Sequence, residues 1–223
     1  MIQSKGWDWK DVNGDFKKYW LTPSVESFYL LHRWKDNGYT SFLDLGCGLG
    51  RHSVLFSKNG LHVHAFDISE DAISRTQIWA KSENLDVDCK IGDMLNLPYS
   101  NNQFDCIFCK NVISHTDTAG VKKGIKEMYR VLKKEGECYL TLSSKDTSDY
   151  KQTDWPMVDE NTLLKMEEGP EFKVPHFYAD HNLISSLFSD FRIETIYQVI
   201  KYYEKDEKVF NSFHYHILAK KPL

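Results

Sequence analysis

Three glycines at alternate positions, Gly46, Gly48 and Gly50, follow the short, mainly apolar run 42–45 and precede a predicted helix over 51–58. Alternate glycines let the backbone turn sharply and remove the Cβ atoms that would keep a ligand away. The first N–H groups of the following helix point at the same gap, which suits a carboxylate or another anion. The stretch therefore predicts a strand, a tight loop and a helix that together bind a nucleotide-like cofactor.

Two acidic residues accompany this loop. Asp44 lies in the strand before it, and Asp67 ends a second apolar run, 62–68. A carboxylate at the end of the second strand, about twenty residues after the loop, accepts hydrogen bonds from both ribose hydroxyls in many α/β nucleotide sites. Asp67 could instead stabilise the N-terminus of the helix predicted over 69–83. We favour the ribose role because strand end and spacing agree.

The loop spacing discriminates between two cofactor classes. A dinucleotide fingerprint, G-x-G-x-x-G, requires a third small residue where this chain has Arg51, which disfavours a nucleotide-dependent oxidoreductase. The segment from Asp44 to Gly50, Asp-Leu-Gly-Cys-Gly-Leu-Gly, resembles motif I of the class I S-adenosylmethionine-dependent methyltransferases. The resemblance extends over 43–142 and implies S-adenosylmethionine as the cofactor.

The resemblance also implies roles for individual residues. An acid after the third strand contacts the adenine amino group in this family, and Asp93 with the apolar Met94 matches that position. The fourth strand, 104–111, ends where the family presents its reacting centre; the Asn-Pro-Pro-Tyr motif of enzymes that modify amide or base nitrogens is absent there. The implied cofactor-binding residues are Asp44, Gly46, Cys47, Gly48, Gly50, Asp67, Ile68, Asp93, Met94 and Asn111.

An acceptor pocket is expected where 111–115, Tyr19 with Trp20, and 176–178 converge, because ligands of open α/β sheets lie beyond the carboxyl ends of the strands. Aromatic rings suit a sulfonium, and a lid excludes water. The predicted acceptor or lid residues are Tyr19, Trp20, Val112 and Tyr178, and the candidate bases, expected to titrate near neutrality, are His115 and His176. The alternative that these histidines merely cap or pack stays open.

The order of predicted elements indicates the fold. Strands alternate with helices through residue 142, and the resemblance implies a Rossmann-like three-layer α/β sandwich whose mostly parallel seven-stranded sheet has the order 3-2-1-4-5-7-6, with strand 7 antiparallel. We expect one domain over 1–223, comprising an N-terminal lid and helix (1–39), a cofactor-binding core (40–144), a substrate-side insertion (145–178), and a C-terminal helix and strand pair (179–223). Residues 145–175 of the insertion are expected to lack a regular element. Within it, Thr22 is the expected N-cap of a helix opened by Pro23, 11–21 is expected to be irregular, and the strands 192–200 and 213–219 are expected to be joined by a charged loop.

Composition and charge exclude several classes. A net charge of −4 does not favour a nucleic-acid partner, and no stretch approaches the length of a membrane span. The cysteines are odd in number, which together with the missing signal segment predicts a cytoplasmic protein with free thiols. No metal site is expected, because Cys106 and Cys109 would face opposite sides of a strand, and His62 with His64 lacks a third ligand.

These observations predict an S-adenosylmethionine-dependent methyltransferase that acts on a small molecule or a soft atom such as sulfur. The aromatic N-terminal segment and 175–178 loosely resemble the thiopurine and tellurite-resistance methyltransferases. The alternative is a non-catalytic cofactor-binding or partner subunit with the same fold. The sequence leaves open the acceptor, the use of a base and the oligomeric state.

Overall fold

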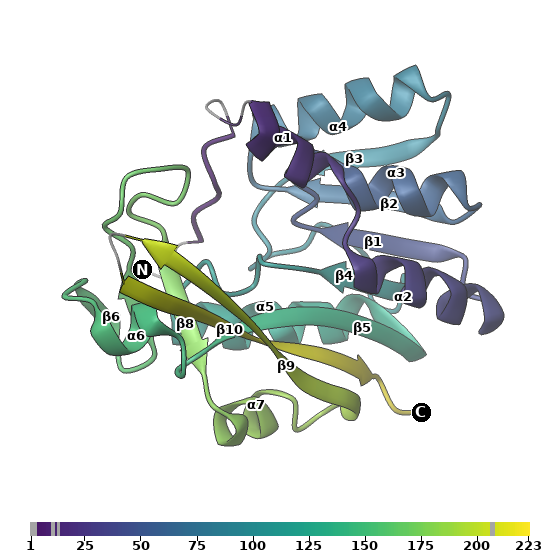
Figure 1. The fold of residues 1–223 in the computed structure, drawn as a ribbon. Helices are drawn as coiled ribbons and strands as arrows, with labels where there is room; N and C mark the ends of the chain where they lie inside the picture. Colours follow the sequence, from purple (N-terminus) through teal and green to yellow (C-terminus); the bar gives the residue numbers. More distant parts are fainter. Residues whose placement is uncertain (1–3, 10–11, 13, 206–207) are drawn as a thin grey trace.

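The structure is a computed structural model that describes residues 4–9, 12, 14–205 and 208–223. Five parallel strands, each followed or preceded by a helix, form its centre (Figure 1). The two central strands Ser41–Leu45 and Phe104–Cys109 are mainly apolar, as expected for strands buried on both faces, whereas the edge strand Val87–Ile91 is mostly exposed. The central elements in chain order are β1 Ser41–Leu45, α3 Arg51–Lys58, β2 His62–Asp67, α4 Glu70–Ser82, β3 Val87–Ile91, β4 Phe104–Cys109, α5 Thr118–Val131 and β5 Leu132–Ser144.

The sheet order confirms the predicted arrangement. The parallel strands run β3-β2-β1-β4-β5. At the far edge β5 pairs antiparallel with β10 (Lys208–Lys220), which pairs antiparallel with β9 (Arg192–Lys205). The predicted order 3-2-1-4-5-7-6 is therefore present, with β9 and β10 as the sixth and seventh strands in chain order.

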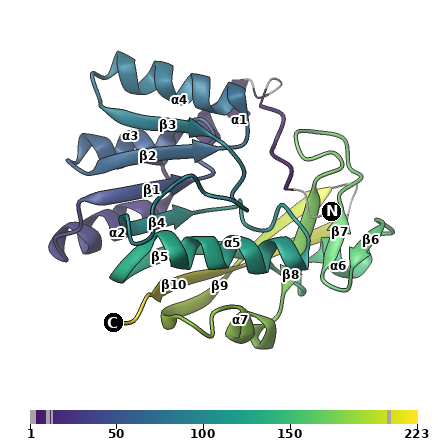
Figure 2. The same ribbon diagram turned by 180° about the vertical axis from the view of Figure 1, so that it is seen from behind.

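Helices cover both faces of the sheet. One apolar core joins the sheet to α5 and to α7 (His181–Leu187), and a second joins it to α3 and to α2 (Val25–Asp36) (Figure 2). Cys109 belongs to the first core and Cys106 to the second, so the two thiols lie on opposite faces as predicted. Helix α2 is held by the buried Glu137, whose carboxylate accepts hydrogen bonds from the neighbouring residues Arg33 and Trp34.

The insertion 145–178 differs from its prediction. It contains α6 (Ser148–Gln152) and three short strands, β6 (Met157–Asp159), β7 (Thr162–Leu164) and β8 (Pro175–Ala179), which pair with one another in antiparallel fashion. Strand β8 also pairs in parallel with the last two residues of β5. The expectation of no regular elements was wrong, because strands of three residues are too short for alternation to reveal them. They enlarge the predicted seven-stranded sheet to ten strands.

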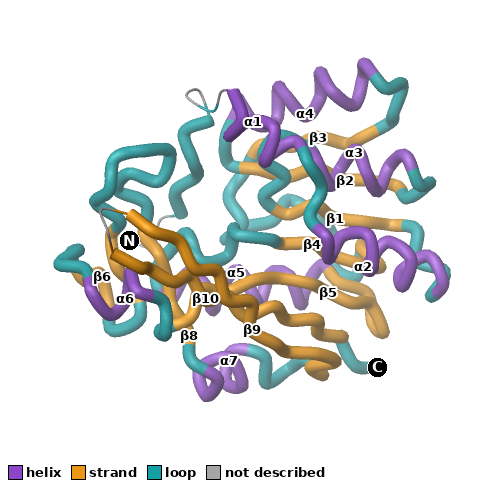
Figure 3. The backbone as a smooth tube through the Cα atoms, viewed as in Figure 1, coloured by secondary structure: helices purple, strands orange, loops and turns teal. Residues whose placement is uncertain are grey.

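Helix α1, the start of α2 and the β9–β10 hairpin also differ from the prediction. Residues 14–21 form helix α1 (Gly14–Leu21) rather than an irregular segment, and α2 begins two residues later than expected, with Ser24 instead of Thr22 at the N-cap position. The Thr22 hydroxyl, the predicted cap, instead donates to the carbonyl of Lys18 at the end of α1. The late strands pair as far as Lys205 and Lys208, so a long hairpin replaces the expected charged loop (Figure 3). None of the described helices has the length and apolar character needed to cross a membrane.

Candidate active site

The glycine loop at the carboxyl end of β1 is a backbone cradle. Gly46, Gly48 and Gly50 have φ values of 75°, 54° and 87°, in the left-handed region that favours glycine. A Cβ on Gly46 would lie 2.2 Å from the Val112 side chain, and one on Gly48 would lie 2.9 Å from the ring of Trp9. Gly50 packs on Thr76 of α4 instead, so its role is to bring the loop and the helix together. The first two glycines line a cavity of about 760 Å³, partly open to solvent.

Asp67 is anchored at the floor of this cavity. Its Oδ2 accepts a hydrogen bond from the N–H of Gly48 at 2.9 Å, and its Oδ1 accepts one from the N–H of Ser69 at 2.9 Å. The residue is only 8% exposed, and burial raises the pKa of its carboxyl group. Each oxygen keeps a second lone pair that can accept from a ribose hydroxyl. The carboxylate is therefore held in one orientation toward the cavity.

The other predicted cofactor residues divide into two groups. Cys47, Ile68, Met94 and Asn111 line the cavity, whereas Asp44 and Asp93 do not. Asp44 is buried beneath the loop, where its Oδ2 accepts from the Ser53 hydroxyl at 2.6 Å and burial raises its pKa to about 7. Asp93 accepts from the N–H of Leu95 and shapes the turn that presents Met94. Asp44 and Asp93 therefore hold the loops that form the cavity wall and do not themselves line the cavity.

Residues 4–9 cross the mouth of this cavity. The rings of Trp7, Trp9 and Trp20 form a cluster with centroid distances of 4.6–5.5 Å, and Trp9 lies over Gly48 with 7% of its surface exposed. Gly6 packs closely against Ile68. We call residues 4–9 the strap; Figures 1 and 2 show it running from the neighbourhood of α1 toward the insertion. The sequence predicted a lid at Tyr19 and Trp20 and missed the strap, whose signal is the pair of tryptophans two residues apart.

Arg51 fastens the segment behind the strap. Its guanidinium donates to the carbonyl oxygens of Tyr19 and Thr22, both at 3.1 Å, and lies 4.8 Å from the ring of Trp20. Cation–π contact of this kind holds an aromatic ring in place. The residue that separates this loop from the dinucleotide fingerprint thus positions the lid.

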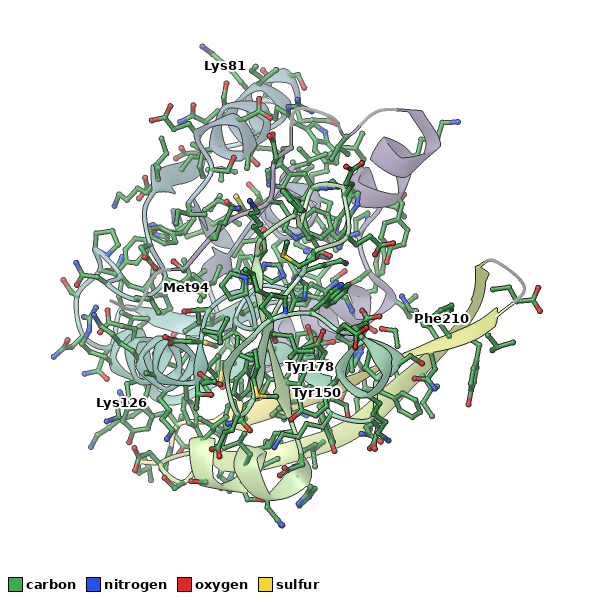
Figure 4. The ribbon with its side chains drawn as sticks, turned by 90° about the vertical axis from the view of Figure 1, so that its left-hand side faces the viewer. Lys81, Met94, Lys126, Tyr150, Tyr178 and Phe210 are labelled. Atoms are coloured by element: carbon green, nitrogen blue, oxygen red, sulfur yellow. The ribbon has the colours of Figure 1, made fainter. Side chains whose placement is uncertain are left out.

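A second cavity of about 930 Å³ adjoins the first, and Trp7, Trp20, Asn111 and His115 line both. Asn111 adopts a left-handed conformation, with φ of 58°, and is fixed by two hydrogen bonds with Thr141. The remaining lining residues are mostly polar: Tyr19, Ser114, Thr141, Ser143, Thr147, Asp149, Lys165, Glu171, His176, Tyr178, Ser212 and His214. The predicted convergence of 111–115, Tyr19 with Trp20, and 176–178 is therefore present. Figure 4 shows Tyr178 beside Tyr150 of α6, with ring centroids 5.1 Å apart.

The structure brings the two predicted histidines together. The rings of His115 and His176 are 5.1 Å apart between centroids, and the Nε2 atom of each faces Glu171. Burial lowers the pKa of both imidazoles, and for His176, with His115 adding to the effect, to about 3. The expectation of titration near neutrality is therefore wrong for His176, and the pKa of His115 is also shifted downward. Sequence reasoning also missed Glu171 and its partner Lys165, which no motif marks.

The comparisons with known proteins agree with this geometry. Residues 42–136 match the family model of a methyltransferase domain. A norajmaline N-methyltransferase from Rauvolfia serpentina is 34% identical over 94 residues, which are 41% of this chain and 32% of that protein. A phosphoethanolamine N-methyltransferase from Plasmodium falciparum is 23% identical over 178 residues, which are 78% of this chain and 66% of that protein. The chain thus spans about a third of the first relative's length and just under two thirds of the second's.

Solved structures share the fold over most of the chain. The PH0226 protein of Pyrococcus horikoshii OT3 superposes with a TM-score of 0.70 at 23% identity, covering 95% of this chain and 93% of that one. TehB of Haemophilus influenzae superposes with a TM-score of 0.66 at 21% identity, covering 92% of this chain and 65% of that one. Residues 42–136 therefore match a methyltransferase domain, and most of the chain shares the fold of solved S-adenosylmethionine-dependent methyltransferases. The glycine cradle, Asp67 and the apolar wall at Ile68 and Met94 fit S-adenosylmethionine as the cofactor.

Proposed function

We propose that the protein transfers the methyl group of S-adenosylmethionine to a small molecule bound in the second cavity. The observation that carries this proposal is the junction of the two cavities, where Asn111 and His115 line both. A donor in the first cavity and an acceptor in the second would meet at this junction. Methyl transfer is a direct displacement that depends on alignment of the two reactants.

Some residues of the chain bind the donor, and others exclude water from the site of transfer. Asp67 holds the ribose, Gly46 and Gly48 leave room for the donor, and Ile68 and Met94 pack on the adenine. The strap and the rings of Trp7 and Trp20 cover the junction and exclude water, which would otherwise compete as a methyl acceptor. The bound cofactor supplies the electrophilic methyl group.

Acceptor activation involves His115 more than His176. His115 lines both cavities and lies at the junction, where a neutral imidazole can hydrogen-bond an acceptor. His176 is a weak proton acceptor, because a base works best when its pKa is near the operating pH and burial holds its pKa at about 3. We assign His115 the role of orienting the acceptor and, for an acidic thiol or hydroxyl, of receiving its proton.

The polar lining favours an acceptor with a heteroatom such as nitrogen, oxygen or sulfur. The names of the relatives include methyltransferases for nitrogen and for oxygen, so they do not select the atom. Two acidic residues, Asp149 and Glu171, and one lysine, Lys165, line the cavity. This balance suits a polar small molecule.

Calorimetry followed by an acceptor panel tests the proposal. We expect the protein to bind S-adenosylmethionine and S-adenosylhomocysteine but not NAD, and then to transfer a labelled methyl group to one class among thiols, amines and hydroxyl compounds. His115→Ala should lower turnover while donor affinity changes only a few-fold. Donor binding without transfer to any class would favour a cofactor-binding subunit instead, and absence of donor binding would refute the assignment of the first cavity.

A further inference from the structure

Three metal-binding side chains meet in the second cavity: His115, Glu171 and His176. The Nε2 of His115 lies 3.7 Å from Oε1 of Glu171, and the Nε2 of His176 lies 3.9 Å from Oε2. One ligand atom from each residue can be chosen so that all lie within 4.8 Å of one another. We call these three residues the two-histidine cluster.

Backbone hydrogen bonds hold the cluster together. The N–H of Phe177, next to His176, donates to the carbonyl of Ser114, next to His115, at 2.8 Å. The N–H of Val174 donates to the carbonyl of Glu171 at 2.9 Å, which turns the chain back toward the histidine. Two segments far apart in the sequence therefore present their side chains to one point before any ligand arrives.

The distances within the cluster are too long for hydrogen bonds and suit an ion. Two ligands bound tetrahedrally to Zn²⁺ at 2.0–2.2 Å stand about 3.3 Å apart. The two histidine–glutamate distances of 3.7 and 3.9 Å are slightly longer than this, and no pair of the three ligand atoms is more than 4.8 Å apart, so small side-chain movements would close the cluster around an ion. The Nε2 of His176 is buried and has no hydrogen-bond partner among the residues that the structure describes. A buried imidazole nitrogen without a partner costs free energy, which a bound ion would recover.

We propose that the two-histidine cluster binds a divalent first-row transition-metal ion through two imidazole nitrogens and one carboxylate oxygen. This donor set suits Zn²⁺ and its neighbours rather than Mg²⁺ or Ca²⁺, which prefer oxygen ligands. The remaining coordination positions face the second cavity. Resting on the proposed function, an acceptor thiol or hydroxyl would occupy one of them. With the ion bound, His115 is a ligand and does not receive the acceptor's proton; the ion lowers the pKa of the acceptor, whose proton passes to solvent.

Lys165 determines how tightly the ion binds. Its ammonium contacts Oε2 of Glu171 at 2.5 Å, so the carboxylate has a counterion without a metal. An incoming ion has to share Glu171 with this charge. Lys165→Met, which keeps the apolar stem and removes the charge, should therefore raise the affinity for the ion.

The experiment titrates the chelator-treated full chain with Co²⁺, followed by visible absorption, and with Zn²⁺ by competition. We expect one ion per chain, and Glu171→Gln and His176→Gln should each weaken binding by at least about 100-fold, the upper end of the loss caused by removing a residue outside the direct ligands. His214→Gln is the matched control, because it lines the same cavity but both its ring nitrogens contact serine hydroxyls. Thermal melting of each variant shows whether it is folded.

Two results overturn the proposal: a wild-type chain that binds no Co²⁺ at micromolar concentration, or a folded Glu171→Gln chain that binds it as tightly as the wild type. Weaker binding in Lys165→Met also contradicts it. S-adenosylhomocysteine affinity is measured on the same samples. Donor binding without metal binding rejects the cluster alone, and metal binding without donor binding rejects the proposed function alone.

Discussion

Asp67 is the residue on which donor binding should depend most directly. Its replacement by Ala removes the acceptor for two backbone N–H groups and for the ribose hydroxyls. Charge-assisted hydrogen bonds of this kind are worth about 1.5–3 kcal/mol, so we expect donor affinity to fall about 10- to 100-fold. Calorimetry with S-adenosylhomocysteine measures the change. The exposed Asp86→Ala is the control and should bind like the wild type; equal affinity in a folded Asp67→Ala chain would disprove the ribose role.

His216 should make stability depend on pH. Burial, followed by the nearby Lys110, lowers its pKa to about 4, against about 6.5 when unfolded. The unfolded chain therefore binds more protons between these values, and native stability falls as pH decreases from about 6.5 to 4. The other groups that face this imidazole are Glu26, Tyr139, Tyr197, Lys201 and His214.

Urea unfolding at several pH values tests this dependence. In His216→Gln the slope of stability against pH should be smaller by up to about 1.4 kcal/mol per pH unit, the value for one proton. His32→Gln, on an exposed part of α2, should leave the slope as it is. Parallel curves for His216→Gln and wild type would mean that the imidazole titrates alike in both states.

Helix α2 is joined to the sheet by one buried acid. Glu137, 1% exposed, accepts two hydrogen bonds from Arg33, at 2.8 and 2.7 Å, and one from Trp34 at 3.0 Å. Glu137→Gln keeps the shape but removes the charge and one acceptor, so we expect a loss of about 1–3 kcal/mol in urea unfolding. Glu135→Gln, which breaks only a surface ion pair with Lys220, should change stability by less than about 0.5 kcal/mol. Similar losses of unfolding free energy in both variants would show that the buried Glu137 contributes no more to stability than the surface Glu135.

The strap is the element that should control donor release. Trp9→Ala removes the ring that lies over Gly48. We expect faster dissociation of S-adenosylhomocysteine in stopped-flow measurements, with a smaller effect on association, because most affinity changes among related variants appear in the off-rate. Trp79→Ala, half-buried on α4 outside the cofactor cavity, should release the ligand at the wild-type rate. Unchanged release in Trp9→Ala would mean that the strap opens independently of the donor.

Elements could be predicted where burial on both faces or a clear turn defines them. Strands β1 and β4 are buried and mainly apolar, and each is followed by a loop. Ser69 caps α4 as expected through its hydrogen bond with Ala72. The three-residue strands β6 and β7 are shorter than any reliable periodicity. The outer part of the β9–β10 hairpin is held by hydrogen bonds between its two strands rather than by burial, so its polar sequence predicted a loop. Figure 4 shows Phe210 in this outer part, far from the body of the molecule.

At the scale of the whole molecule, the prediction of the site followed the prediction of the sheet. The carboxyl ends of parallel strands meet at one edge, which brought Gly46, Asp67 and Asn111 to one cavity. Glu171 and the strap could not be predicted, because their positions depend on contacts between the insertion and the N-terminus. The single-domain division of the chain and its cytoplasmic location stay predictions.

Hydrogen bonds join the strap over the donor cavity to the segment around Glu171 in the acceptor cavity. The N–H of Asp8 in the strap donates to the carbonyl of Pro170, just before Glu171, and the Lys5 ammonium donates to the carbonyls of Phe172 and Lys173, just after it. The strap over the donor cavity is thus hydrogen-bonded to the wall of the acceptor cavity, and we expect the donor to leave only when that wall moves. We expect compulsory-order kinetics, with S-adenosylmethionine entering first and S-adenosylhomocysteine leaving last. Product inhibition by S-adenosylhomocysteine should then be competitive against the donor and noncompetitive against the acceptor. Binding of the two substrates in random order would contradict this expectation.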